Sequence, residues 1–83
     1  MKYLEKYYSE IASSDYWKAV KNVEKLLRSD ISLNSQMLQD LDANSLCVLF
    51  DRKWADYELH MEDPQYLHNY EVVRREMSLR DYI

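Results

Sequence analysis

The sequence contains no glycine and a single proline, Pro64, in 83 residues. Glycine supplies the positive backbone φ angles of many tight turns and the close backbone approach of phosphate-binding loops. Its absence excludes collagen-like chains and nucleotide-binding proteins that use a glycine-rich loop, and it argues against turn-rich β architectures. The content of 47% hydrophobic and 31% charged residues is typical of a globular chain. We therefore expect one compact domain over residues 1–83.

Cysteine and long apolar runs are also scarce. Cys47, the only cysteine, lies in the apolar run from Leu46 to Phe50, so no internal disulfide can form and we expect a buried thiol. No segment has the length of a membrane span, and the first 13 residues lack the apolar stretch of a signal peptide. These features predict a soluble, cytoplasmic protein with no membrane partner.

Apolar residues recur at helical spacing along most of the chain, without the sustained alternation that is typical of strands. The pattern predicts an all-α fold, a compact single-domain bundle of four to five short helices. We expect a loop over residues 29–34 in which Ile31 and Leu33 contact the core. The predicted helices cover about residues 3–11, 15–28, 35–41 and 44–61, with a last helix from Pro64 onward.

Each predicted helix carries an apolar stripe that identifies candidate core residues. The longest helix has a second, weaker stripe of Val48, Ala55 and Leu59, which predicts that it is covered on two sides or meets another molecule. The main stripes are Tyr16, Val20, Val23 and Leu27 in the second helix, Leu46, Phe50, Trp54, Tyr57 and Met61 in the longest helix, and Tyr66, Tyr70, Val73 and Met77 in the last.

Polar residues at the predicted helix starts are candidate caps. The segment Ser13–Asp15 offers side-chain oxygens for the start of the second helix, and Asp63 followed by Pro64 predicts the start of the last one. Four-residue spacing also predicts two ion pairs on helix surfaces, Glu24 with Arg28 and Glu71 with Arg75.

No pattern indicates catalysis or a cofactor. The candidate metal ligands Glu58, His60, Glu62 and His68 lack the spacing of known helical metal motifs. A buried Cys47 has no electropositive surroundings that would activate a thiol. We therefore expect a non-enzymatic protein without metal or cofactor.

The negative charge is concentrated in the middle of the chain. The formal net charge is −4, but residues 30–63 alone carry eight acidic and two basic side chains. An acidic segment of this kind fits a basic surface on a partner protein. The candidate partner-binding residues are Asp51, Asp56, Glu58, Glu62 and Asp63, together with three aromatic residues expected to be exposed, Trp17, Tyr8 and Tyr82.

Two alternatives remain open. Lys18, Lys21, Lys25 and Arg28 fall on one face of the predicted second helix beside Trp17, which would suit a nucleic-acid backbone. The second stripe of the longest helix would instead suit a homodimer or another self-associating structural protein. The first hypothesis remains a small regulator or inhibitor that binds a partner protein, of the kind found among immunity proteins, antitoxins and the small proteins of phages and mobile elements.

Overall fold

A computed structural model describes residues 11–28 and 30–83, and the described part of the chain contains helices and no strands. The predicted all-α bundle is therefore confirmed. The helices are α2 (Ser13–Asn22), α3 (Ser35–Leu38), α4 (Ala43–Leu59) and α5 (Pro64–Leu79). The helix predicted over residues 3–11 lies mostly outside the described residues.

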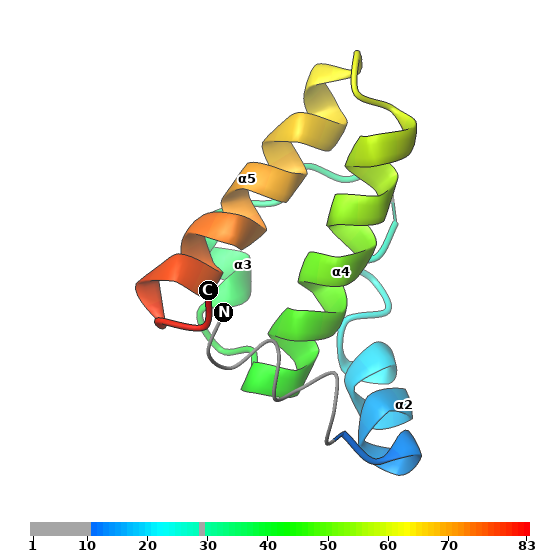
Figure 1. Cartoon of the computed structure of the whole chain (residues 1–83), viewed down its shortest axis with the longest axis vertical. Helices are drawn as coiled ribbons and strands as arrows, with labels where there is room; N and C mark the ends of the chain where they lie inside the picture. The colour runs from blue at the N-terminus through cyan, green and yellow to red at the C-terminus, as the bar shows by residue number, and fades with distance from the viewer. Residues whose placement is uncertain (1–10, 29) are drawn as a thin grey trace.

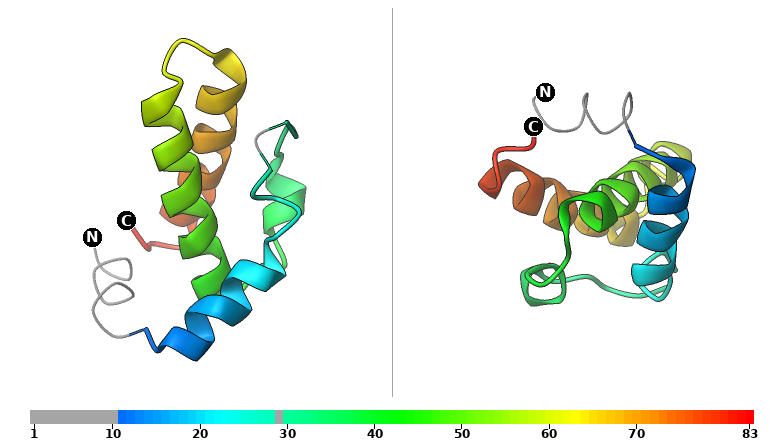
Figure 2. Two further views of the ribbon diagram at one scale, coloured as in Figure 1. Left: turned by 90° about the vertical axis from the view of Figure 1, so that its right-hand side faces the viewer. Right: turned by 90° about the horizontal axis from the view of Figure 1, so that it is seen from below.

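Helices α4 and α5 form an antiparallel hairpin, and the other two helices pack around it. Figure 1 shows the hairpin with its connecting turn at the top, α3 beside α5, and α2 near the opposite end of α4. The two views of Figure 2 show α2 crossing the N-terminal half of α4 at an angle. The turn between α4 and α5 therefore lies at the end of the hairpin that is far from α2.

The N-terminal half of α4 is the centre of the core. Six consecutive residues, from Ser45 to Phe50, are buried, so this part of the helix is covered all round. In the expected second stripe Val48 is buried, whereas Ala55 and Leu59 are exposed. The two-sided cover predicted from that stripe is thus confirmed only where α2 crosses α4. The remaining core side chains come from α2 and the turn that follows it, from the loop before α3, and from α3 and α5. They include Ala19, Val23, Leu33, Leu38, Val73 and Met77.

The start of α5 follows the sequence prediction. Pro64 occupies the first turn, and an Oδ1 atom of Asp63 accepts a hydrogen bond of 2.9 Å from the backbone N–H of Gln65. The start of α2 does not follow the prediction, because Ala12 is at the N-cap and no side chain caps the helix. Asp15 instead lies in the first turn, where its charge is favourable to the positive end of the helix dipole.

Helix α2 is shorter than predicted, because it ends at Asn22 and residues 23–27 form turns. Two contacts with α4 fix this segment. Asn22 Nδ2 donates to the Oγ atom of the buried Ser45 at 3.3 Å, and Lys53 Nζ donates to the carbonyl oxygen of Arg28 at 2.9 Å. The helical spacing of apolar residues continues to Leu27, but these tertiary hydrogen bonds favour an earlier end of the helix.

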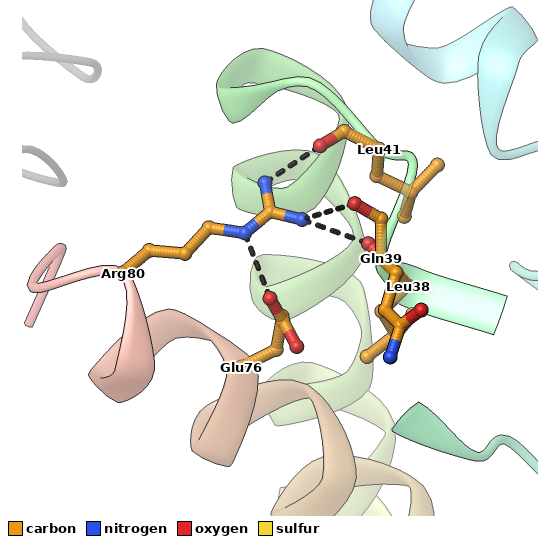
Figure 3. Close-up of polar contacts among 5 residues, drawn as sticks. All are labelled: Leu38, Gln39, Leu41, Glu76 and Arg80. Carbon is orange, nitrogen blue, oxygen red and sulfur yellow. Dashed lines mark hydrogen bonds and ion pairs between the residues drawn. The ribbon is translucent and has the colours of Figure 1, made fainter. Parts of the chain in front are cut away.

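Helix α3 is also shorter than its predicted range, and Arg80 takes up the carbonyl groups at its end. The Arg80 guanidinium donates to the carbonyl oxygens of Leu38 at 2.8 Å, Gln39 at 3.2 Å and Leu41 at 2.6 Å. Its Nε atom also donates to Glu76 at 2.8 Å (Figure 3). The Leu38 carbonyl oxygen also accepts from the backbone N–H of Leu41 at 3.2 Å, so Arg80 adds side-chain donors to the end of α3 and the residues that follow it.

The loop before α3 is fixed to α5, as the apolar Ile31 and Leu33 predicted. Asn69, which is 1% exposed, accepts from the backbone N–H of Leu33 at 2.9 Å and donates to the carbonyl oxygen of Ile31 at 2.8 Å. The side chain of Gln65 adds a second bond to the Ile31 carbonyl at 3.2 Å. The backbone N–H and C=O groups of this loop have side-chain amides as partners in place of the backbone partners that a helix or strand would supply.

The chain folds back after α5. Asp81 adopts a positive φ of 62°, and the backbone N–H of Tyr82 donates to the carbonyl oxygen of Met77 at 2.9 Å. This is the arrangement of a Schellman C-cap, with aspartate in the position that glycine usually takes. It brings Tyr82 and Ile83 against the core.

Candidate protein-binding surface

The turn between α4 and α5 exposes two large apolar side chains. Leu59, the last residue of α4, is 78% exposed, and Met61 is 63% exposed. The prediction that Met61 belongs to the buried stripe is wrong, because α4 ends two residues earlier and α2 does not reach this end of the hairpin. Trp54 on the same predicted stripe is also partly exposed.

Carboxylates flank these apolar side chains along the chain. Glu58 precedes Leu59, and Glu62 and Asp63 follow Met61; all three carboxylates are on exposed residues. We refer to Glu58, Leu59, Met61, Glu62 and Asp63 as the acidic tip. An apolar centre with a charged rim is the usual composition of a protein interface.

Backbone bonds and ring stacking hold the acidic tip in one conformation. The backbone N–H of His60 donates to the carbonyl oxygens of Asp56 and Tyr57, both at 3.1 Å, and the N–H of Asp63 donates to the carbonyl oxygen of His60 at 3.0 Å. The rings of His60 and Tyr66 stack with their centroids 4.4 Å apart. These contacts connect the backbone of the turn to the end of α4 and the start of α5.

The other predicted acidic residues lie apart from this tip. Asp51 is exposed on α4, about 10 Å along the helix axis from Glu58 for a spacing of seven residues. Asp56 is half-buried, and its Oδ1 atom lies 3.6 Å from Nε of Arg52. Asp51 and Glu58 lie on α4, whereas Glu62 lies beyond the end of that helix, so these three carboxylates do not share one helical face.

The predicted aromatic residues have different environments. Trp17 is 66% exposed, as expected, and its ring makes an edge contact with Tyr16. Tyr82 is half-buried against the core, so its expected exposure is wrong; the C-terminal turn directs it inward. Tyr8 lies outside the described residues.

The predicted basic stripe does not form one helical face. Lys18 and Lys21 are exposed on α2, but Lys25 and Arg28 lie beyond the end of that helix. Arg28 pairs with Asp30 instead of the predicted Glu24, through Nη2···Oδ2 at 2.6 Å and Nε···Oδ1 at 3.0 Å. This hydrogen-bonded pair lowers the pKa of Asp30 and raises the pKa of Arg28.

The single cysteine is buried, whereas His68 is exposed and its ring lies against a backbone carbonyl. Cys47 is buried as predicted, and desolvation, reinforced by the negative charge of Asp42, raises the pKa of its thiol to about 12. The ring of His68 is within 2.8 Å of the Leu33 carbonyl oxygen. Residues 11–28 and 30–83 contain no group of three or more His, Cys, Asp or Glu side chains that could hold a metal ion. Within the same ranges no helix combines the length and apolar character needed to cross a membrane.

Sequence patterns did not identify the exposure of Leu59 and Met61, although one signal was present. The cap formed by Asp63 and Pro64 requires the preceding helix to end several residues earlier, which places Met61 in a turn. The buried Lys53 and Asn69 and the half-buried Arg80 gave no comparable signal, because the backbone carbonyl groups to which they donate are 25 or more residues away.

Comparisons of this chain with protein-family models, with curated proteins and with solved structures found no match.

Proposed function

We propose that this protein is a non-enzymatic binding module that regulates or inhibits a partner protein, and that the acidic tip is its docking surface. The observation that carries the proposal is the exposure of Leu59 and Met61 between carboxylates, in a turn that is held rigid. Large apolar side chains that are this exposed and lie two residues apart in one turn support a contact surface more strongly than a single exposed one would.

The composition of the tip defines the partner chemistry. Leu59 and Met61 would enter an apolar recess, while Glu58 and Glu62 would contact surrounding lysine or arginine side chains. The carboxylates would accelerate encounter with a basic surface and make association sensitive to salt. A regulator of this kind would act by covering a basic groove that the partner uses for another ligand.

Affinity capture with matched variants tests this proposal. Tagged wild-type protein, Leu59→Ala/Met61→Ala and Glu58→Lys/Glu62→Lys are compared in nuclease-treated lysate of the native host. Leu79→Ala is the control, because Leu79 is 75% exposed at the other end of α5. We expect one stoichiometric protein that wild type and Leu79→Ala retain and both tip variants lose. Retention of that protein by both tip variants would refute the proposal.

The alternative as a nucleic-acid-binding regulator rests on Trp17, Lys18 and Lys21, which α2 does expose. Capture of nucleic acid that is abolished by Lys18→Gln/Lys21→Gln, without a nuclease-resistant protein partner, would favour this alternative. Its affinity would fall steeply with ionic strength. The alternative as a self-associating protein predicts species larger than 10.1 kDa in sedimentation of the purified protein.

A further inference from the structure

A second surface, which shares no residue with the acidic tip, lies on the flank of the hairpin. Phe50 and Trp54 of α4 and Tyr70 of α5 form an aromatic wall beside a pocket of 670 Å³. The ring centroids of Phe50 and Trp54 are 5.7 Å apart, and those of Trp54 and Tyr70 are 6.3 Å apart. Trp54 is 40% exposed, so its ring is available to a ligand that enters the pocket.

Two arginines line the same pocket and differ from the other arginines of the chain. Arg28, Arg52 and Arg80 each pair with a carboxylate. Arg74 and Arg75 are exposed and form no ion pair or hydrogen bond with any residue that the structure describes.

Glu71, the acidic residue in the pocket lining, forms no ion pair with either arginine. Glu71 lies one helical turn before both arginines and also lines the pocket. The Glu71–Arg75 ion pair predicted from the sequence is absent from the described residues. Both guanidinium groups therefore have donors that no residue described by the structure uses.

We propose that this pocket binds an acidic segment of a partner protein, with one aromatic or aliphatic side chain against Trp54 and Tyr70 and neighbouring carboxylates on Arg74 and Arg75. The volume lies within the range of about 300–1,000 Å³ that is usual for ligand pockets. The planar guanidinium fork matches a carboxylate through two parallel hydrogen bonds. Charge complementarity therefore selects an acidic segment over a basic one.

A nucleic acid fits the site less well, although its bases could stack on Trp54. Binding of a nucleic-acid strand depends on a row of phosphate contacts. The pocket supplies two arginines beside one glutamate, on a chain with a net charge of −4. A short acidic peptide needs only the local pair of arginines.

Trp54 provides a direct reporter of this binding. The chain has two tryptophans, so Trp17→Phe leaves Trp54 as the single one. The probe is a synthetic five-residue peptide with a central phenylalanine flanked on each side by two aspartates. One control peptide has asparagine in place of each aspartate, and another has alanine in place of phenylalanine. A single-stranded oligothymidine is titrated in parallel.

We expect the acidic peptide to give a saturable change in Trp54 emission, and both control peptides to bind at least about tenfold more weakly. Arg74→Gln/Arg75→Gln should weaken binding of the acidic peptide by a similar factor. Lys18→Gln/Lys21→Gln removes the same charge elsewhere and should leave binding unchanged. Thermal unfolding confirms that each variant is folded.

Four results would overturn the proposal. They are absence of a saturable change, equal binding of the asparagine peptide, unchanged binding by the arginine variant, and tighter binding of the oligothymidine than of the acidic peptide. Self-association of the free protein that Arg74→Gln/Arg75→Gln abolishes would assign the pocket to a second copy of this chain. None of these results depends on the acidic tip, so the two proposals fail separately.

Discussion

The Nζ atom of Lys53 donates a hydrogen bond of 2.9 Å to the backbone carbonyl oxygen of Arg28. This lysine is only 2% exposed and lies on the buried side of α4. Its bond joins the centre of α4 to the chain segment that follows α2. A lysine side chain thus takes a core position because its amine reaches a backbone carbonyl in the irregular segment between α2 and α3.

Replacement of Lys53 by methionine should lower the free energy of unfolding by about 1–3 kcal/mol. Methionine retains most of the apolar stem but leaves the Arg28 carbonyl without its donor. Urea unfolding measures the change. The control is Lys21→Met on the exposed face of α2, which should change stability by less than about 0.5 kcal/mol. Equal effects of the two substitutions would contradict a specific role of the Lys53 bond.

The same lysine predicts a pH dependence. Burial, as the largest cause, lowers the pKa of Lys53 below its ordinary value of 10.5. In the pH range just below 10.5 the unfolded chain therefore binds more protons than the folded chain, so this group makes stability rise with pH there. The difference in unfolding free energy between wild type and Lys53→Met should therefore shift in favour of wild type as the pH rises through that range. A constant difference between the two proteins would contradict the lowered pKa.

Arg80→Lys should destabilise the protein by about 1–3 kcal/mol, although the charge is kept. A lysine cannot donate in a fixed fork to the carbonyl groups of Leu38, Gln39 and Leu41 at the same time. The substitution should also accelerate amide hydrogen exchange more in α3 than in the α4–α5 hairpin. Arg74→Lys is the matched control on the same helix and should have little effect. Unchanged exchange in α3 would show that the guanidinium does not hold it.

Asn69→Ala should cost about 2–4 kcal/mol of stability, because it leaves the buried N–H of Leu33 and the carbonyl of Ile31 short of partners. Gln65→Ala, which removes a weaker and more exposed contact with the same loop, should cost about 1 kcal/mol. Denaturant unfolding of both variants gives the comparison. If Gln65→Ala destabilised the protein as much as Asn69→Ala, Asn69 would not be the main residue that fixes this loop.

The thiol of Cys47 should be almost unreactive in the folded protein. Its pKa of about 12 leaves very little thiolate at pH 8, and the side chain is buried. A maleimide reagent should modify it at the rate of unfolding and rapidly in urea. The raised pKa also predicts that stability falls as the pH increases from 9 toward 12, because the unfolded thiol ionises first. Cys47→Ala should remove that part of the decrease.

The candidate surfaces were predicted only in part from the sequence. Charge counting identified Glu58, Glu62 and Asp63, because acidic residues on a short segment remain close together in most folds. It did not identify the exposed Leu59 and Met61, because an apolar side chain at helical spacing is assigned to the core unless the end of the helix is known. The basic stripe failed for the same reason, since it required α2 to continue to Arg28.

The sequence by itself determined the helical class, the buried centre of α4 around Leu46 and Phe50, and the start of α5 at Asp63 and Pro64. These features depend on periodicity and capping, which act over a few residues. Only the tertiary structure decided the burial of Lys53, the reach of Arg80 to α3 and, among the residues that the structure describes, the absence of an ion pair for Arg74 and Arg75. The bonds of Lys53 and Arg80 join groups that are 25 and 42 positions apart in the sequence. No local pattern encodes which distant groups come into contact.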